Sequence, residues 1–221
     1  MKVIIFGATG MVGSGVLREC LQDDAVEAVL SVGRRSGGRA GGKLRELLLA
    51  DVSDLSPVEA QLTGFDACFF CLGVPSAGMK EAEYRRLTHD LTLSVARTLA
   101  RLNPSMTFVY VSGAGTDTSE SGRSMWARVK GQTENDLLKL PFRSAYMFRP
   151  GIIRALHGIR PRSRLYRTMY FVLTPIVLLV AVLLPERVTT TESVGRAMIR
   201  VAQRQPPVRI LPTRAINELA A

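Results

Sequence analysis

The sequence of 221 residues predicts a doubly wound α/β fold, in which helices cover both faces of one parallel sheet. Three observations predict it. Short apolar, strand-like runs alternate with segments of helical period through the first 150 residues. A glycine-rich turn joins the first run to the first helical segment. The composition, with 47% hydrophobic and 22% charged residues, is typical of a chain that buries its own core. We expect the strand order 3-2-1-4-5-6 or a close variant.

Six strands and the helices between them follow from the pattern of apolar residues. The predicted strands are Lys2–Phe6, Val26–Val32, Leu44–Ala50, Asp66–Leu72, Thr107–Ser112 and Ser144–Arg149. The predicted helices are Met11–Leu21, one that begins at the capping box Ser56-Pro57-Val58-Glu59, Glu81–Leu102 and Ser124–Leu140. After residue 187, threonine caps near Thr191 predict a final helix, and Val208–Leu211 predicts a short added strand.

The glycine-rich turn is the first candidate site. Gly7-Ala8-Thr9-Gly10-Met11-Val12-Gly13 follows the first strand and opens the first helix. Glycines let the backbone turn sharply and approach a pyrophosphate, which then meets the exposed N–H groups of the helix. Glycine spacing alone is a weak signal, and a merely tight turn is the alternative. The flanking strand and helix make it specific, so the sequence predicts a dinucleotide site.

The end of the second strand indicates which dinucleotide is bound. An acidic residue there would hold the ribose 2′-hydroxyl of NAD, but this strand runs into Arg34 and Arg35. Because two guanidinium groups suit a 2′-phosphate, we predict NADP(H) over NAD(H), with solvated loop arginines as the alternative. At the next strand ends we expect Asp51-Val52 at the adenine edge and Leu72-Gly73 beneath the ribose.

Five motifs stand at the strand ends and on the helices that follow them: Gly7–Gly13, Cys71-Leu72-Gly73, Val111-Ser112-Gly113-Ala114, Val129-Lys130-Gly131-x-x-Glu134 and Arg149-Pro150-Gly151. Together they resemble the short-chain dehydrogenase/reductase superfamily, and more narrowly its atypical or extended branch of NAD(P)-dependent epimerase and NmrA-like proteins. The resemblance implies a Rossmann NAD(P)-binding domain over residues 1–155, with Pro150 at the cofactor. It also implies a C-terminal substrate-side region over 156–221 packed on the same domain.

The same resemblance implies the active-site residues of a reductase or epimerase-like protein acting on a carbonyl or sugar-like molecule. Ser112 would orient the substrate carbonyl, and Lys130 would bind the nicotinamide ribose. The family's tyrosine, four residues before the lysine, is here Trp126. An indole N–H has no useful acidity, so it is no general acid or base. We therefore predict His157 as a third catalytic residue, with Tyr84 and Tyr146 as further candidates.

A second class of function stays open beside the enzyme. If no proton moves, the chain is a non-catalytic NADP(H)-sensing regulator, and the indole of Trp126 stacks on the nicotinamide. Residue 126 discriminates between the two, because a tyrosine there would complete the resembled catalytic set.

The net charge of +10 lies entirely in the last part of the chain. Residues 1–140 balance 16 Lys and Arg against 16 Asp and Glu, whereas residues 141–221 hold 13 Arg and 3 Glu. Within this part, 168–184 is uncharged and short of the roughly twenty residues of a spanning helix. Peripheral membrane contact through 160–187, a homo-oligomer interface and a substrate-side core remain open, with a full membrane span as the least favoured alternative. The arginines adjoin aliphatic residues, without an array of aromatic stacking positions or a recognisable binding motif, so we expect no nucleic-acid partner.

The remaining features favour a reduced, cytoplasmic protein, with membrane association left open. Three cysteines are too few for a disulfide framework, and the start of the chain lacks the apolar run of a secretory signal. Cys68 and Cys71 lie in a strand with side chains on opposite faces, which predicts buried, inert thiols. The sequence predicts no metal site.

Overall fold

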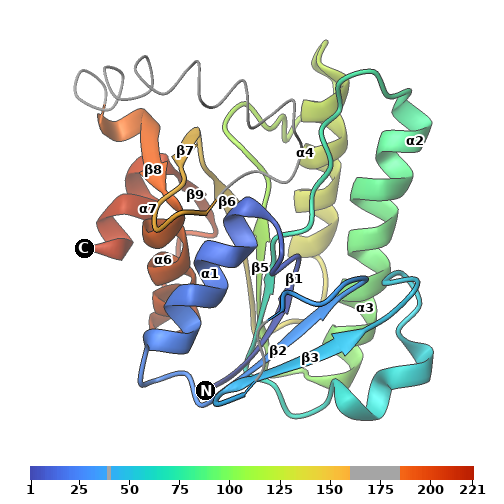
Figure 1. Ribbon diagram of the computed structural model, residues 1–221. Helices are drawn as coiled ribbons and strands as arrows, with labels where there is room; N and C mark the ends of the chain where they lie inside the picture. Colours follow the sequence, from blue (N-terminus) through green and yellow to red (C-terminus); the bar gives the residue numbers. More distant parts are fainter. Residues whose placement is uncertain (39–40, 160–184) are drawn as a thin grey trace.

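The computed structural model describes residues 1–38, 41–159 and 185–221 and has a seven-stranded parallel sheet at its centre (Figure 1). The strands run in the order β3-β2-β1-β4-β5-β6-β9, which confirms the predicted order of the first six. They are β1 (Lys2–Phe6), β2 (Ala28–Gly33), β3 (Leu44–Leu48), β4 (Ala67–Phe70), β5 (Thr107–Val111), β6 (Ser144–Arg149) and β9 (Ile210–Pro212). The doubly wound α/β fold is therefore the fold of the chain.

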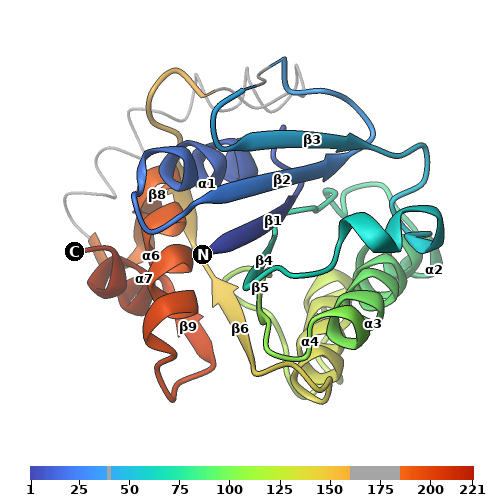
Figure 2. The ribbon, with the colours of Figure 1, turned by 90° about the horizontal axis from the view of Figure 1, so that it is seen from below.

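Helices cover both faces of this sheet (Figure 2). They are α1 (Met11–Gln22), α2 (Glu81–Arg85), α3 (Leu91–Leu102), α4 (Met125–Leu138), α6 (Thr191–Arg204) and α7 (Thr213–Ala220). The side chains of β1 alternate between two apolar clusters. Val3 and Ile5 pack with α1 and α6, and Ile4 and Phe6 pack with α3. Such alternation is what a strand buried on both faces requires.

The C-terminal part of the chain completes the same sheet. The strand β9 pairs with β6, and α6 lies along α1 so closely that a Cβ on Gly15 would come 2.5 Å from Cβ of Thr191. Two three-residue strands, β7 (Ile152–Arg154) and β8 (Val188–Thr190), form a separate parallel pair. The side chain of Thr190 caps α6 by accepting from the N–H of Ser193 at 2.9 Å. The added strand and the capped helix confirm the prediction for this region, but α6 is not the final helix, because α7 follows β9.

Two helix predictions were wrong in detail. The segment Ser56–Gln61 is a 3-10 helix without a side-chain cap. The hydroxyl of Ser56 donates back to Asp54 at 2.6 Å, so it does not form a capping box. The predicted helix 81–102 is interrupted by a π-helical turn, Arg86–Asp90, between α2 and α3. Apolar periodicity does not register one extra residue in a turn.

The basic and apolar segment remains outside this description. Within residues 1–38, 41–159 and 185–221, no helix is long and apolar enough to cross a membrane. The predicted segment 168–184 and the arginines at 160–167 lie outside the described residues. Membrane contact through 160–187 and a homo-oligomer therefore stay predictions.

Candidate functional site

Two adjoining cavities open at the carboxyl ends of the strands, where an open α/β sheet binds ligands. The first has a volume of about 220 Å³ and the second about 560 Å³. Leu72, which follows β4, lines both. The first is lined by Gly7, Ala8, Thr9, Ser31, Val32, Gly33, Arg34, Arg35 and Leu72. The second is lined by Gly10, Met11, Val12, Cys71, Leu72, Gly73, Val74, Val111, Ser112, Gly113, Ala114, Lys130, Pro150, Gly151 and Ile153.

The glycine loop between β1 and α1 forms a cradle that has no room for a side chain. Gly7 has a φ of +82°, and a Cβ there would lie 2.9 Å from the carbonyl group of Cys71. A Cβ on Gly13 would lie 2.1 Å from the carbonyl oxygen of Gly7. Gly10 is the N-cap of α1, and no side chain caps the helix there. Its first N–H groups thus suit a phosphate, so the residues present fit the diphosphate of a dinucleotide.

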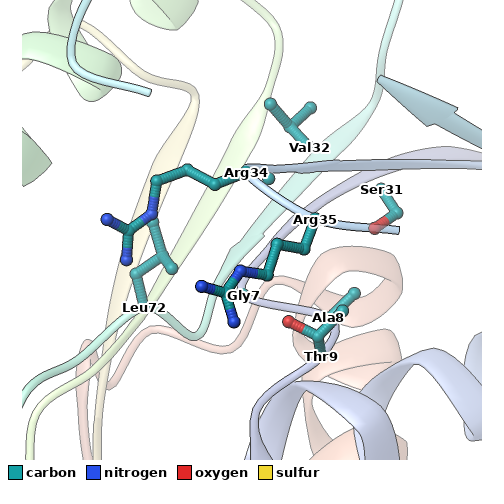
Figure 3. A pocket seen from close by; sticks show the side chains of 9 residues that line it. Gly7, Ala8, Thr9, Ser31, Val32, Arg34, Arg35 and Leu72 are labelled. Carbon is teal, nitrogen blue, oxygen red and sulfur yellow. The ribbon is translucent and has the colours of Figure 1, made fainter. Parts of the chain in front are cut away.

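Arg34 and Arg35 lie at the first cavity together with the glycine loop (Figure 3). The guanidinium group of Arg35 extends toward Gly7 and Thr9, and that of Arg34 toward Leu72 (Figure 3). Glu46 of β3 holds the following turn, because its carboxylate accepts from the hydroxyl of Ser36 at 2.5 Å and the N–H of Gly37 at 2.7 Å. Two cations therefore stand beside the predicted phosphate cradle.

The residues predicted at the adenine edge, Asp51 and Val52, are not in the lining of this cavity. Asp51 is exposed and accepts from the N–H and the hydroxyl of Ser53 at 2.8 and 2.7 Å. These hydrogen bonds, with a smaller effect of Arg34, lower the pKa of Asp51. Val52 is buried in the apolar cluster on the α3 face. Neither is among the described residues that line the two cavities.

Ser112 and Lys130 meet at the second cavity, as the sequence predicts. The Lys130 ammonium donates to the main-chain carbonyl of Ser112. The hydroxyl of Ser112 donates to the carbonyl oxygen of Phe148 at 3.0 Å. Burial lowers the pKa of Lys130 to about 8, and the nearby Glu134 carboxylate partly opposes that shift. Gly73 and Pro150 line the same cavity.

Trp126 and the three other candidates for proton transfer, His157, Tyr84 and Tyr146, lie elsewhere. The Trp126 ring lies against the loop after β5, where a Cβ on Gly115 would come within 3.4 Å of it. His157 Nε2 lies 2.7 Å from a carboxylate oxygen of Glu192 in α6. Tyr84 is buried, and the hydroxyl of Tyr146 donates to the carbonyl of Pro206 at 2.8 Å. None of the four is among the described residues that line these two cavities.

A buried ion pair lies next to the second cavity, and the sequence motifs that contain its two residues predict no role for it. Glu134 in α4 is 0% exposed, and the guanidinium of Arg149 donates to both of its carboxylate oxygens. Arg149 ends β6 and precedes Pro150, so the pair fixes α4 to the sheet beside Lys130. The signal available in the sequence was a carboxylate one helical turn beyond Lys130.

Cys68 is buried, as predicted, whereas Cys71 is only partly buried. All three cysteines are free. Cys68 packs in the α3-side cluster, whereas Cys71 contacts the opposite cluster and lines the second cavity. Burial raises the pKa of Cys71 to about 12 and that of Cys68 well above its ordinary value. At neutral pH such thiols are protonated and poorly nucleophilic.

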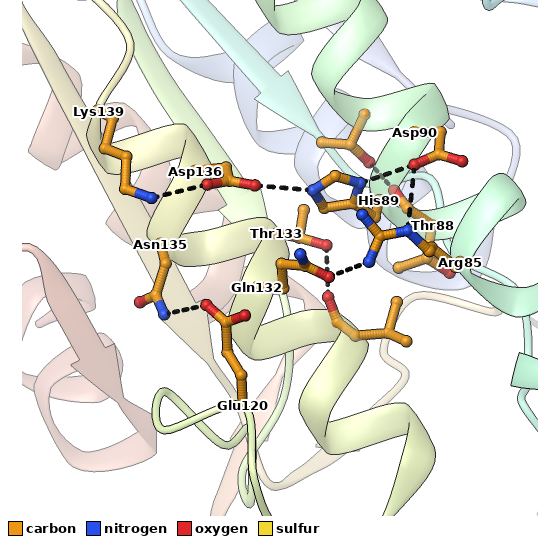
Figure 4. A network of polar contacts seen from close by, with 12 residues as sticks. Arg85, Thr88, His89, Asp90, Glu120, Gln132, Thr133, Asn135, Asp136 and Lys139 are labelled. Carbon is orange, nitrogen blue, oxygen red and sulfur yellow. Dashed lines mark hydrogen bonds and ion pairs between the residues drawn. The ribbon is translucent and has the colours of Figure 1, made fainter. Parts of the chain in front are cut away.

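The π-helical turn places His89 between two carboxylates, and the contact with the carboxylate in α4 holds that helix in position (Figure 4). Its ring nitrogens lie 2.7 Å from Asp90 and 2.9 Å from Asp136 in α4. Burial raises the pKa of Asp136, but hydrogen bonds from His89 and Lys139 outweigh it, so the pKa lies below the ordinary 3.8. The stability that this shift provides is present above pH 3.8 and is lost as the pH falls below it.

We expect His89→Leu to lower the free energy of unfolding by about 2 kcal/mol, since it leaves two carboxylates without their buried partner. Chemical denaturation at pH 7 measures this, and Lys139→Ala, at a site 73% exposed, should cost under about 1 kcal/mol. His89→Leu should also lose less stability than the wild type between pH 5 and pH 3. Equal losses for both variants at pH 7 would contradict a locking role for His89.

Comparisons with known proteins agree with this geometry. The model of the NAD dependent epimerase/dehydratase family matches residues 3–145. The mitochondrial protein fmp52 of Emericella nidulans is 31% identical over 170 residues, which cover 74% of this chain and 70% of that protein. FMP52 of Candida albicans, also named mitochondrial, is 29% identical over 167 residues, with the same shares of both chains.

Solved structures share the fold at low sequence identity. The Bordetella bronchiseptica enzyme WbmF, in complex with NAD⁺, aligns with a TM-score of 0.70 at 15% identity, over 99% of this chain and 76% of WbmF. A short chain dehydrogenase from Burkholderia cenocepacia, in complex with NADP, aligns with a TM-score of 0.63 at 11% identity, over 95% and 86%. Because the family model matches most of the length of the chain, the chain belongs to the NAD-dependent epimerase/dehydratase family.

Proposed function

We propose that this chain binds NADP(H) and acts as an oxidoreductase or epimerase of the short-chain dehydrogenase/reductase type on a carbonyl or sugar-like small molecule. The observation that carries the proposal is the shared cavity of the glycine loop and the two arginines at 34 and 35. A phosphate cradle beside two guanidinium groups suits a dinucleotide with an extra phosphate on its adenosine ribose.

The lining residues divide into those that would hold the two ends of the cofactor. Gly7–Gly13 would hold the diphosphate, Arg34 and Arg35 the 2′-phosphate, and Leu72 the adenosine side. Gly73, Lys130 and Pro150 would hold the nicotinamide side. When bound, the cofactor would donate a hydride to, or accept one from, the substrate carbon. Ser112 and Lys130 then face the substrate from the same cavity.

Calorimetry with NADPH and NADH tests the cofactor. We expect Arg35→Ala to weaken NADPH about 10- to 100-fold and to leave NADH nearly unchanged, because one or two charge-assisted hydrogen bonds are lost. Arg45→Ala is the matched control, because this substitution removes the same charge. Arg45 is exposed on neighbouring β3 and does not line either of the two described cavities. Binding of NADH as tight as that of NADPH by the wild type would refute the NADP(H) preference.

A specific observation supports a second candidate, a non-catalytic NADP(H)-sensing protein. Trp126 stands where the resembled enzymes have tyrosine, and indole cannot exchange a proton usefully. If the wild type binds NADPH but reduces no aldehyde or ketone, and Trp126→Tyr creates turnover, the sensing role is supported. Wild-type turnover that is lost in His157→Ala would instead support an enzyme with His157 as its acid.

The cellular compartment is a separate question. The fungal relatives are named mitochondrial, and this supports a mitochondrial location for those proteins only. For this chain a cytoplasmic location stays a prediction from cysteine usage.

A further inference from the structure

We propose that Lys130 is itself the proton donor and acceptor of the second cavity, in place of the hydroxyl that Trp126 lacks. This inference rests on the proposed function and adds the group that moves the proton. It depends on which side chains line the second cavity and on what each of them already donates to.

Three described side chains that line the second cavity carry an exchangeable proton: Cys71, Ser112 and Lys130. The hydroxyl of Ser112 donates to the carbonyl of Phe148 at 3.0 Å, and its N–H donates to the same oxygen at 2.8 Å. Its lone pairs remain available to orient a ligand, but its proton is already engaged. Burial raises the pKa of Cys71 to about 12, so this thiol is a poor acid. Lys130 remains.

The geometry of Lys130 suits a proton donor. An ammonium group has three N–H bonds, and in Lys130 one of them donates to the main-chain carbonyl of Ser112. That bond holds Nζ at the end of β5 and leaves two N–H bonds for other partners. Its neighbour Glu134 is hydrogen-bonded by the guanidinium of Arg149 rather than by the amine.

The electrostatics agree with this geometry. Burial lowers the pKa of Lys130 to about 8, with Glu134 opposing the shift. At pH 7 the ammonium form prevails and the neutral form is accessible, which is the condition for efficient general acid and base catalysis. The Trp126 indole lies against Gly115, and His157 pairs with Glu192. Neither offers a comparable proton within the described lining.

The proposed step is balanced in both directions. In reduction, the carbonyl carbon gains the hydride of the nicotinamide, and the C=O π pair moves to oxygen. The oxygen takes a proton from Lys130 Nζ, so an N–H bond breaks, an O–H bond forms and a neutral amine remains. Water restores the proton to the amine. In oxidation, the neutral amine takes the hydroxyl proton of the alcohol as its carbon loses the hydride.

A measurement independent of turnover tests the amine. The full chain is pulsed with formaldehyde and cyanoborohydride from pH 6 to pH 11, and methylation of each lysine is followed by peptide mass spectrometry. We expect a midpoint near pH 8 for Lys130, and protection of Lys130 by NADPH. Lys139, also at α4, is the internal control, because its bond to Asp136 raises its pKa above 10.5. A Lys130 midpoint equal to that of Lys139 would overturn the inference.

Turnover provides the second test. With NADPH and a panel of small aldehydes and ketones, wild-type reduction should fall as the pH rises through about 8, since the ammonium form is the acid. Lys130→Arg keeps the positive charge but holds its proton, so turnover should fall about 10²- to 10⁴-fold while NADPH affinity changes only a few-fold. Lys139→Arg should match the wild type.

The other possible outcomes of these experiments also decide whether the inference holds. Turnover retained in Lys130→Arg, or lost in His157→Ala, overturns the inference and leaves the proposed function standing. A wild type that binds NADPH but reduces none of the panel overturns it in favour of the sensing role. A wild type that gives no heat with either dinucleotide refutes the proposed function itself.

Discussion

Gly13→Ala is expected to destabilise the chain by about 3 kcal/mol or more and to abolish dinucleotide binding. The added Cβ would come 2.1 Å from the carbonyl oxygen of Gly7, a backbone atom that cannot rotate away. Relief requires α1 to move from β1, and that movement opens the cradle from which the first N–H groups of α1 point. Urea denaturation and calorimetry with NADPH measure the two effects.

Gly10→Ala is the matched control for the loss of stability in this prediction. Its Cβ would lie 3.3 Å from the same Gly7 oxygen, a tight contact that a small shift relieves. We expect a loss of stability under about 1 kcal/mol. Gly10 nevertheless lines the second cavity, so a methyl group there should hinder the close approach of a phosphate. If Gly13→Ala bound NADPH as the wild type does, the loop would not be the phosphate cradle.

The second large effect is expected for Glu134→Ala, at about 3–5 kcal/mol of lost stability. Glu134 is fully buried, and its removal leaves the guanidinium of Arg149, whose side chain is 19% exposed, without a partner. A buried unpaired charge costs far more than the net value of the pair. Chemical denaturation at pH 7 measures the loss.

Two further variants separate this effect from the general loss of an ion pair. Arg101→Ala removes an exposed pair with Glu59 and should cost no more than about 1 kcal/mol. Glu134→Leu combined with Arg149→Met replaces both charges and should recover much of the stability lost in Glu134→Ala. A double variant as unstable as the single one would show that the loss comes from packing rather than from the unpaired charge.

The strands of the sheet could be predicted from the sequence more completely than the helices and short strands that surround it. The six strands were predictable because parallel strands buried on both faces need nearly continuous apolar runs, as in β1 and β6. The π-helical turn at Arg86–Asp90 was not predictable, because its packing involves the contact of His89 with Asp136 of another helix. The helix α7 and the pairing of β7 with β8 depend likewise on partners far along the chain.

The candidate site divides in the same way. The glycine loop, Arg34 and Arg35 were predictable, because they follow directly from strand ends that the pattern locates. Ser112 and Lys130 were predicted only from the family resemblance, and both line the second cavity. The positions of Asp51, Val52 and His157 relative to the cavities were not, because a side chain beside a strand end can turn outward, into the core or toward another helix.

By itself the sequence determined the α/β fold, the strand order and the glycine cradle, because these follow from local backbone preference and from apolar periodicity. The tertiary structure alone decided that Glu134 is buried against Arg149, that the Ser112 hydroxyl donates a hydrogen bond to the carbonyl oxygen of Phe148, and that Lys130 is desolvated at the second cavity. The ionisation and hydrogen bonding of a side chain depend on groups distant in the chain, and only folding brings those groups together.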